Sequence, residues 1–172
     1  IIIARGGQAA YIKQYTNIPL VEIVLTGQEL SRLIVRAKRR VAKERPVIAI
    51  IGFENMYSDM SYFEEIFDII LRTYFIDGIE KSADYVELAV REGADILIGG
   101  DVVNELAVLH NVPALFIEST EDSIRNALNT ARKMSYAAEV ENKYIAQFET
   151  VLDTSVNGIV KINEEKEITN IN

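Results

Sequence analysis

The sequence predicts an α/β fold in which two doubly wound parallel sheets form the two lobes of a clamshell, as in periplasmic binding proteins. Five short runs in the 172-residue chain are continuously apolar rather than alternating, which is typical of strands covered on both faces. Amphipathic stretches with helical spacing separate these runs. Strands that alternate with helices in this way form parallel sheets with right-handed crossovers.

The expected strands are marked by proline. The five apolar runs are IIIA (1–4), VEIVL (21–25), VIAIIGF (47–53), DILIGG (95–100) and ALFIES (114–119). Pro19, Pro46 and Pro113 stand near the starts of three runs, and proline ends a helix but is tolerated where a strand begins. Each proline therefore marks the connection from a helix to the next strand.

Apolar stripes at three-and-four spacing indicate two of the helices between these strands. The first stripe comprises Leu30, Leu33, Ile34, Ala37 and Val41. The second stripe comprises Phe63, Ile66, Phe67 and Ile70. Both stretches are therefore expected to bury one helical face.

The starts and ends of helices have their own signals. Two pairs of residues have the spacing of capping boxes, which predicts helix starts, namely Thr26 with Glu29 and Ser61 with Glu64. Gly93 follows YVELAVRE and Asn111 follows ELAVLH, at the position where a left-handed residue commonly ends a helix. These signals fix the expected element boundaries.

A short pattern occurs twice in the chain, in the order strand, Gly-Gly, helix, Asn-x-Pro, strand, Thr, helix. Gly6 and Gly7 correspond to Gly99 and Gly100. The later positions of the pattern are Asn17, Pro19 and Thr26 in the first copy, and Asn111, Pro113 and Thr120 in the second. Either any two βαβ units share this punctuation, or the halves of a two-lobed molecule resemble each other. Both interpretations place a ligand at the same edge.

Composition excludes several classes of function. The net charge of −8 opposes a nucleic-acid backbone, and the absence of cysteine excludes disulfides and cysteine-based zinc sites. Neither Gly-Gly stretch matches a dinucleotide or P-loop motif, and a single histidine, His110, gives no support for a triad or a metal site. No apolar run is long enough to span a membrane. We therefore expect a cytoplasmic protein without cofactor or metal.

A ligand site is expected at the carboxyl ends of the strands, where loop amides and helix N-termini converge in open parallel sheets. Arg5 is the strongest single candidate, because its guanidinium suits a carboxylate. The candidate ligand-binding residues are Arg5, Gly6, Gly7, Gln8, Thr26, Gly52, Phe53, Asn55, Gly99, Gly100, Asp101, Ser119 and Thr120.

Each candidate also has a purely structural interpretation. In the structural interpretation, the glycines allow close packing of a strand and a helix, and Arg5 pairs with a structural carboxylate. Thr26, Ser119 and Thr120 then only cap helices. Asp101 repels an anionic ligand, so it is either a helix N-cap or an acceptor for a hydroxyl or ammonium group. These alternatives stay open at the level of sequence.

A long helix is expected from Glu121 to about Leu152, because no glycine or proline interrupts this stretch. Its first apolar stripe comprises Ile124, Leu128, Ala131, Ser135 and Ala138, and is expected to pack on the sensor lobe. A second stripe then takes over, comprising Val140, Tyr144, Phe148 and Val151. This second part is either a linker that pairs with another subunit or a solvated spacer.

Several stretches together carry a family resemblance. They are IIIARGGQAAYIK, IPLVEIVLTGQEL, IAIIGFENM, GADILIGGDVV and LHNVPALFIESTEDSIRNAL. They resemble, in order and over most of residues 1–135, the N-terminal sensory domain of the propionate catabolism activator (PrpR) family. VLDTSVNGIVKINEEKEITNIN resembles the first strands of a PAS domain.

The resemblance implies a cytoplasmic, bacterial transcriptional activator that depends on sigma-54, with sensory, PAS, AAA+ ATPase and helix-turn-helix domains. Members of the family respond to organic acids such as 2-methylcitrate, and effector binding relieves a restraint on the ATPase. By position, the family's loop motifs fall on Arg5, Gly6, Gly7, Gly52, Phe53, Asn55, Gly99, Gly100, Ser119 and Thr120. The family usually has Ser or Thr near the first Gly-Gly, whereas Ala4 and Gln8 flank RGG here.

The expected organisation has three parts. Residues 1–136 form the effector-sensing domain, with lobe one at 1–46 plus 119–136 and lobe two at 47–118. Residues 137–152 form a linker helix, and residues 153–172 begin a PAS domain. The chain starts with Ile1 in an apolar run that has no preceding strands, so we expect part of the first lobe to be missing.

We expect a non-catalytic module in which an organic-acid effector closes the lobes and shifts the helix that begins at Glu121. The partners expected are this effector and further copies of the chain, with DNA and sigma-54 polymerase reached only through other domains, and no membrane. One alternative is an isomerase or racemase that uses Glu54, Asp101 and Glu121 for acid-base chemistry. The other is a dimerisation module with an empty cleft.

Overall fold

A computed structural model describes residues 1–171 of the chain. These residues form two compact units, of which the first is Ile1–Thr130 and the second begins at Ala131. The long helix α6 (Glu121–Thr154) begins in the first unit and ends in the second. None of the described helices is both long and apolar enough to cross a membrane.

The main sheet of the first unit has four parallel strands. They are β3 (Val47–Gly52), β4 (Ile70–Phe75), β5 (Ile96–Gly99) and β6 (Ala114–Phe116), in the spatial order β4-β3-β5-β6. Ile50 of β3 is in register with Thr73 of β4 and with Ile98 of β5. After β3 the chain adds β4 on one side of it, and then adds β5 and β6 on the other side. This reversal makes the sheet doubly wound, and the crevice between β3 and β5 is where such sheets bind ligands.

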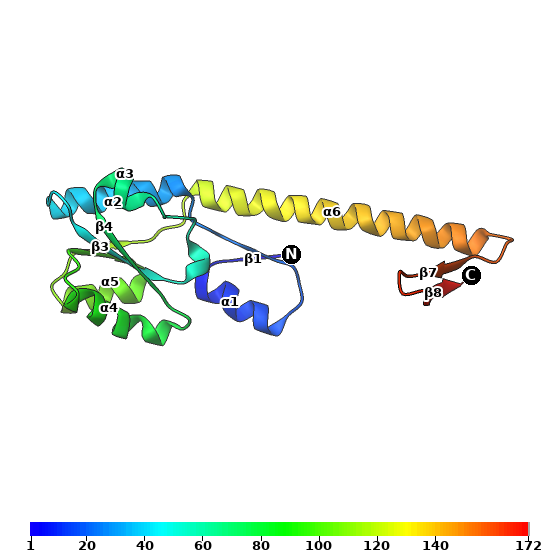
Figure 1. Ribbon diagram of the computed structural model, residues 1–172, viewed down its shortest axis with the longest axis horizontal. Coiled ribbons are helices and arrows are strands. Elements are labelled where there is room, and N and C mark those ends of the chain that lie inside the picture. The colour runs from blue at the N-terminus through cyan, green and yellow to red at the C-terminus, as the bar shows by residue number, and fades with distance from the viewer. Residues whose placement is uncertain (172) are drawn as a thin grey trace. The chain divides into compact units, whose positions relative to one another are not determined.

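Helices cover both faces of this sheet (Figure 1). On one face, α2 (Gly27–Val41) and α3 (Phe63–Phe67) pack on side chains such as Ile48 and Ile50. On the other face, α4 (Ser82–Arg91) and α5 (Asp101–Leu109) pack on Ala49 and Ile51. Alternate residues of β3 are therefore buried on opposite faces, which explains the continuous apolar run in the sequence.

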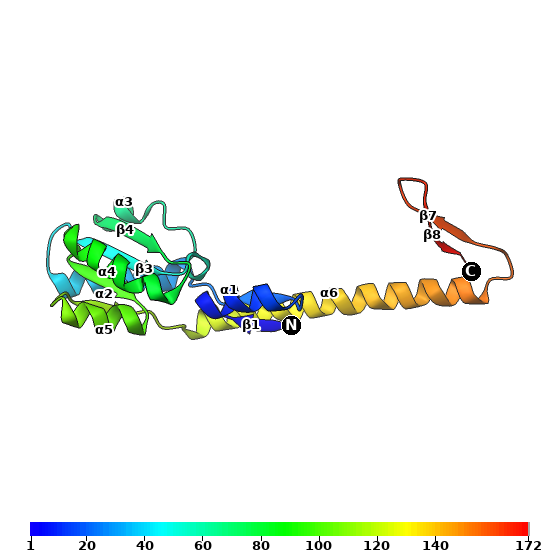
Figure 2. The same ribbon diagram turned by 90° about the horizontal axis from the view of Figure 1, so that it is seen from below.

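A second, smaller sheet lies at the N-terminus. β1 (Ile2–Ala4) and β2 (Leu20–Glu22) pair in parallel, with Ile2 opposite Leu20, and α1 (Gly6–Tyr15) connects them. Figures 1 and 2 show α1 beside β1, and it also contacts β2 and the short helix η1 (Glu54–Met56) that follows β3. The α/β class with parallel sheets and helices on both faces is confirmed.

The region before β4 differs from the prediction. α3 ends at Phe67, and Asp68 adopts a left-handed conformation with φ of 50°. Ile70 therefore starts β4 instead of continuing a helix, and Ile66 is exposed. The capping box at Ser61 is wrong, because its hydroxyl donates to Asp59 and the Glu64 carboxylate accepts from the Leu71 amide at 2.7 Å.

The capping box at the start of α2 is confirmed. The Glu29 amide donates to Thr26 Oγ1 at 3.2 Å, and the Thr26 amide donates to Glu29 Oε2 at 2.7 Å. The buried stripe of α2 packs on the four-stranded sheet. This position differs from the expected first lobe of residues 1–46, which placed the helix with β1 and β2.

The buried stripe at the start of α6 is offset from the prediction. Ser123 and Ala127 are buried, whereas Ile124 and Leu128 are 41% and 46% exposed. The hydroxyl of Ser123 donates to the Thr120 carbonyl at 3.1 Å, so this polar side chain is satisfied within the first turn. The first turn of α6 is thereby oriented with its small residues, rather than its large ones, toward the body of the unit.

The second unit holds the rest of α6 and a β-hairpin. β7 (Val160–Ile162) and β8 (Ile168–Ile171) pair in antiparallel fashion. The Nζ atom of Lys161 lies 5.4 Å from the ring centre of Phe148, and Leu152 is buried. The predicted second stripe of α6 is largely exposed at Tyr144 and Val151.

Candidate functional site

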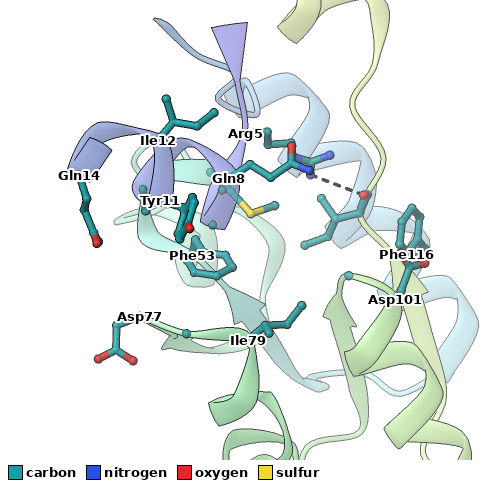
Figure 3. A pocket seen from close by; sticks show the side chains of 17 residues that line it. Arg5, Gln8, Tyr11, Ile12, Gln14, Phe53, Asp77, Ile79, Asp101 and Phe116 are labelled. Atoms are coloured by element: carbon teal, nitrogen blue, oxygen red, sulfur yellow. Dashed lines mark hydrogen bonds between the residues drawn. The ribbon is translucent and has the colours of Figure 1, made fainter. Parts of the chain in front are cut away.

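A pocket of about 830 Å³ lies at the carboxyl edge of the main sheet, on the side where α1 is placed. Its floor comes from the segments that follow β3, β4, β5 and β6, and its opposite wall comes from the first part of α1. Figure 3 shows these elements around the pocket. The switch point between β3 and β5 therefore opens into a cavity, as the topology requires.

The walls of this pocket are mostly apolar. Tyr11 and Ile12 come from α1, Phe53 follows β3, Ile79 follows β4, and Phe116 ends β6 (Figure 3). Such a lining with a few polar groups is typical of small-molecule sites, whose volumes are about 300–1,000 Å³.

Arg5 is the cation of this pocket, and it also contacts the segment that leads into α6. Its Nη1 atom donates to Ser119 Oγ at 2.7 Å, and its Nη2 atom donates to the Ile117 carbonyl at 3.5 Å. The Nε atom is buried and has no hydrogen-bond partner among the described residues. Burial lowers the pKa of Arg5, and the side chains of Tyr57 and Glu29 counter this in part. The guanidinium stays charged, as arginine does in proteins.

A buried carboxylate lies behind Arg5. Glu29 is 3% exposed, and its Oε1 atom accepts from the Thr120 amide at 3.2 Å and from the Thr120 hydroxyl. Burial alone would raise the pKa of Glu29, but hydrogen bonds from Thr120, Thr26 and Ser123 outweigh it and lower the pKa to about 2. Glu29 is therefore ionised at neutral pH and holds the start of α6 against the start of α2.

The first turn of α5 forms another part of the pocket. Gly100 is the N-cap of α5 and Asp101 is its first residue, so the interpretation of Asp101 as the N-cap is wrong. The Asn104 amide group donates to the Gly99 and Gly100 carbonyls at 3.1 and 2.9 Å. A methyl group added at Gly100 would meet no atom within 4 Å, so the backbone here is open to the pocket.

Three other glycines are required by packing. A Cβ atom at Gly99 would lie 2.5 Å from Cβ of Val103, and one at Gly7 would lie 2.5 Å from the Phe53 ring. A Cβ atom at Gly52 would overlap the hydroxyl of Tyr57. The structural interpretation therefore accounts for these three positions.

The sequence-predicted residues divide into two groups. Those that line the pocket are Arg5, Gly6, Gly7, Gln8, Phe53, Gly100 and Asp101. Those outside the lining are Thr26, Gly52, Asn55, Gly99, Ser119 and Thr120. Ser119 and Thr120 nevertheless contact Arg5 and Glu29. Asn55 supports α1 instead, since its amide donates to the Gly6 carbonyl at 3.2 Å and to Glu22 at 2.8 Å.

Several lining residues were not predicted. Asp77, Gly78 and Ile79 follow β4, a strand that the sequence did not predict. Tyr11 and Ile12 sit one turn beyond the Gly-Gly pair in α1, where helical spacing from Gly7 and Gln8 would have found them. Phe116 ends β6, and the alternation of that strand turns it toward the pocket instead of the core.

The residues considered for acid-base catalysis do not meet in this pocket. Asp101 lines it, whereas Glu54 belongs to a separate surface depression beside α3 and Glu121 pairs with Arg125 on α6. Of the three residues named for the isomerase alternative, Asp101 is therefore the one that lies in the described lining of the cavity.

Known proteins give two relevant similarities. An NtrC family transcriptional regulator from Clostridium acetobutylicum has a similar solved structure, with 23% identity and a TM-score of 0.62, covering 77% of this chain and 68% of that chain. This likeness concerns the fold. No curated protein matches the chain. The propionate catabolism activator family matches residues 1–141, which is most of the sequence. The chain thus belongs to the propionate catabolism activator family.

Proposed function

We propose that the first unit is the sensory domain of a transcriptional activator and that it binds an organic-acid effector in the pocket beside Arg5. Family membership and the similar fold support a sensory domain in a regulator. The observation that supports an acidic ligand is Arg5, a cation in a mostly apolar pocket, whose buried Nε atom has no hydrogen-bond partner among the described residues. Guanidinium groups bind carboxylates through charge-assisted hydrogen bonds, and these are stronger than neutral ones.

The amides of the first turn of α1 add to this anion site. Gly6 and Gly7 line the pocket in that turn, and the first amides of a helix lack intrahelical partners. A carboxylate held by Arg5 also lies near the positive end of the α1 dipole. The effector's acid group is therefore placed between the guanidinium and the start of α1.

Ligand binding reaches α6 through the contact between Arg5 and Ser119. A carboxylate competes for the same Nη1 hydrogen that Ser119 Oγ accepts in this structure. Release of Ser119 loosens the residues just before α6, while Glu29 still holds Thr120. Arg5 binds Ser119 in one conformation and the effector's carboxylate in the other. The effector shifts the equilibrium between these conformations only by the difference between its affinities for them. Movement of the start of α6 is the signal.

The remaining expectations rest on the family resemblance. They are that the β7 and β8 hairpin begins a PAS domain, that the chain is a homo-oligomer, and that sigma-54 polymerase and DNA are contacted through other domains. They stay predictions. The antiparallel pairing of the hairpin is the structural feature that favours the first of them.

Calorimetry on the whole chain tests the proposal. The titrants are a panel of carboxylic acids, from short-chain monocarboxylates to tricarboxylates. We expect saturable binding of at least one acid, and a loss of at least tenfold in affinity for Arg5→Ala, because a hydrogen bond to a charged group contributes about 1.5–3 kcal/mol. Arg45→Ala is the matched control, since Arg45 is exposed beside Asp68 and does not line the pocket. Absence of binding by every acid, or full binding by Arg5→Ala, overturns the proposal.

A further inference from the structure

The charges around the pocket limit the kind of acid that fits it. Among the described lining residues, Arg5 is the only cation, and Asp77 and Asp101 are carboxylates. Asp77 is exposed and forms an ion pair with Lys81 at 2.7 Å. The Asp101 carboxylate has no hydrogen-bond or ion-pair partner among the described residues. A ligand therefore meets one available positive group and one available negative group.

The Asp101 carboxylate has no structural role in the first turn of α5. It does not cap α5, because Gly100 is the N-cap and Asp101 is the first residue inside the helix. A carboxylate in the first helical turn does gain from the helix dipole. That gain explains why an acidic residue is tolerated here, but it leaves all the acceptor positions of the carboxylate available to a ligand.

The other side chains that line the pocket are mostly apolar, so they favour a ligand with an apolar part. Tyr11, Ile79 and Phe116 are 62%, 61% and 41% exposed although they are large apolar or aromatic side chains. Phe53, the residue after β3, lines the same pocket (Figure 3). An aromatic or branched hydrocarbon group removes this surface from water, which a small, highly charged ligand does not do.

We infer that the pocket selects acids with one carboxylate, a separate hydroxyl or ammonium group, and an aromatic or branched apolar body, and that it discriminates against tricarboxylates. This inference rests on the proposed function and names its ligand class. The carboxylate binds Arg5, the donor group binds Asp101, and the apolar body covers Tyr11 and Phe53. A tricarboxylate such as citrate brings three negative charges to one guanidinium and repels Asp101. The ligand class thus differs from the 2-methylcitrate that the family resemblance implies.

Three probes with one skeleton test this inference by calorimetry on the whole chain. They are phenylpropionate, phenyllactate and phenylalanine, which differ only in whether a hydrogen, hydroxyl or ammonium stands beside the carboxylate. We expect phenyllactate or phenylalanine to bind at least tenfold more tightly than phenylpropionate, since hydrogen bonds to a charged group are among the strong ones. Citrate is expected to bind more weakly than all three.

The variant Asp101→Asn tests whether the Asp101 carboxylate causes the preference for phenyllactate or phenylalanine. This nearly isosteric variant is expected to reduce the tenfold preference for the hydroxyl or ammonium probe without weakening phenylpropionate, because the charge that is removed repels the carboxylate. Glu105→Gln is the matched control, because it removes a charge one turn later in α5 without touching the pocket. Thermal unfolding of both variants shows whether the fold is retained.

The outcomes separate this inference from the proposed function. If citrate binds most tightly and Arg5→Ala abolishes its binding, the proposed sensory site stands and the ligand class is overturned. The class is also overturned if the three phenyl probes bind equally or if Asp101→Asn changes nothing. If no acid binds at all, the proposed function fails and this inference fails with it.

Discussion

Glu29 and Thr120 are joined by hydrogen bonds although they are 91 residues apart in the chain. The same carboxylate completes the capping box of α2 through its other oxygen. One buried side chain therefore fixes the starts of two helices, and Arg5 binds Ser119, the residue beside Thr120. The segment that enters α6 is held by the Glu29 carboxylate and the Arg5 guanidinium. Each of these two side chains can be tested separately.

Removal of the Glu29 charge should lower stability. In Glu29→Gln an amide group faces the donors of Thr26 and Thr120, so at least one buried donor loses its acceptor. We expect the free energy of unfolding at pH 7 to fall by roughly 1–3 kcal/mol in urea titrations. Glu44→Gln, an exposed change in the loop after α2, is the control and should leave the unfolding midpoint in place.

Glu29 should also determine part of the loss of unfolding free energy at acidic pH. Its pKa is about 2 in the folded protein, below the ordinary value of 4.5, so the unfolded chain takes up the proton first. The contribution of Glu29 is therefore fully present above about pH 4.5 and is lost as the pH falls toward 2. Glu29→Gln should show a shallower loss of stability over this window. An identical slope in both proteins would contradict the role given to Glu29.

Alanine substitutions at the two adjacent glycines at the end of β5 should lower stability by different amounts. Gly99→Ala places a Cβ atom 2.5 Å from Val103, so we expect a loss of about 1–3 kcal/mol in unfolding free energy. Gly100→Ala meets open space at φ of −77° and should cost less than about 1 kcal/mol, yet it narrows the pocket and should weaken acid binding. Equal stability of the two variants in thermal unfolding would argue against the packing described here.

Ser119→Ala tests the competition between Ser119 and the ligand. Without the hydroxyl, Arg5 Nη1 loses a partner in the free protein, so a carboxylate no longer has to displace it. We expect an acid that binds the wild type to bind this variant about two- to tenfold more tightly, because the displaced bond is one to a charged group. Ser61→Ala, at an exposed position outside the lining of the pocket, is the control. Weaker binding by Ser119→Ala would show that Ser119 supports the bound state instead.

Tyr11→Ala tests the apolar wall. Tyr11 is 62% exposed, so its truncation should barely change stability, while the contact area for a phenyl group is lost. We expect several-fold weaker binding of phenyllactate with little change for acids that lack an apolar body. Tyr62→Ala is a suitable control, since Tyr62 is equally exposed and lies outside the pocket.

Local sequence signals were sufficient for most of the fold. Proline marked the starts of strands, the capping box at Thr26 formed, and Gly93 and Asn111 adopt φ values of 82° and 54°. Each of these signals acts within a few residues and depends on backbone sterics or a single hydrogen bond. They depend little on tertiary packing, although the capping box predicted at Ser61 did not form.

Errors arose where tertiary packing decides between two local patterns. Ile66 and Ile70 fit a helical stripe, but pairing of Ile70 with Val47 of β3 makes it a strand residue. Ile124 and Leu128 have the better apolar spacing in α6, yet Ser123 and Ala127 are the buried positions. Arg5 was found as a pocket residue from its motif, whereas Ile79 depended on the strand that was not identified.

The buried Nε atom of Arg5 has a consequence for sensitivity. A buried donor without an acceptor raises the free energy of a folded protein by about 1–3 kcal/mol. If the proposed site binds an anion, a shift of the guanidinium that gives Nε an acceptor would remove this penalty as the anion binds. Part of the free energy of binding would then come from the strained position of Arg5, so that an acid with few contacts of its own would still bind.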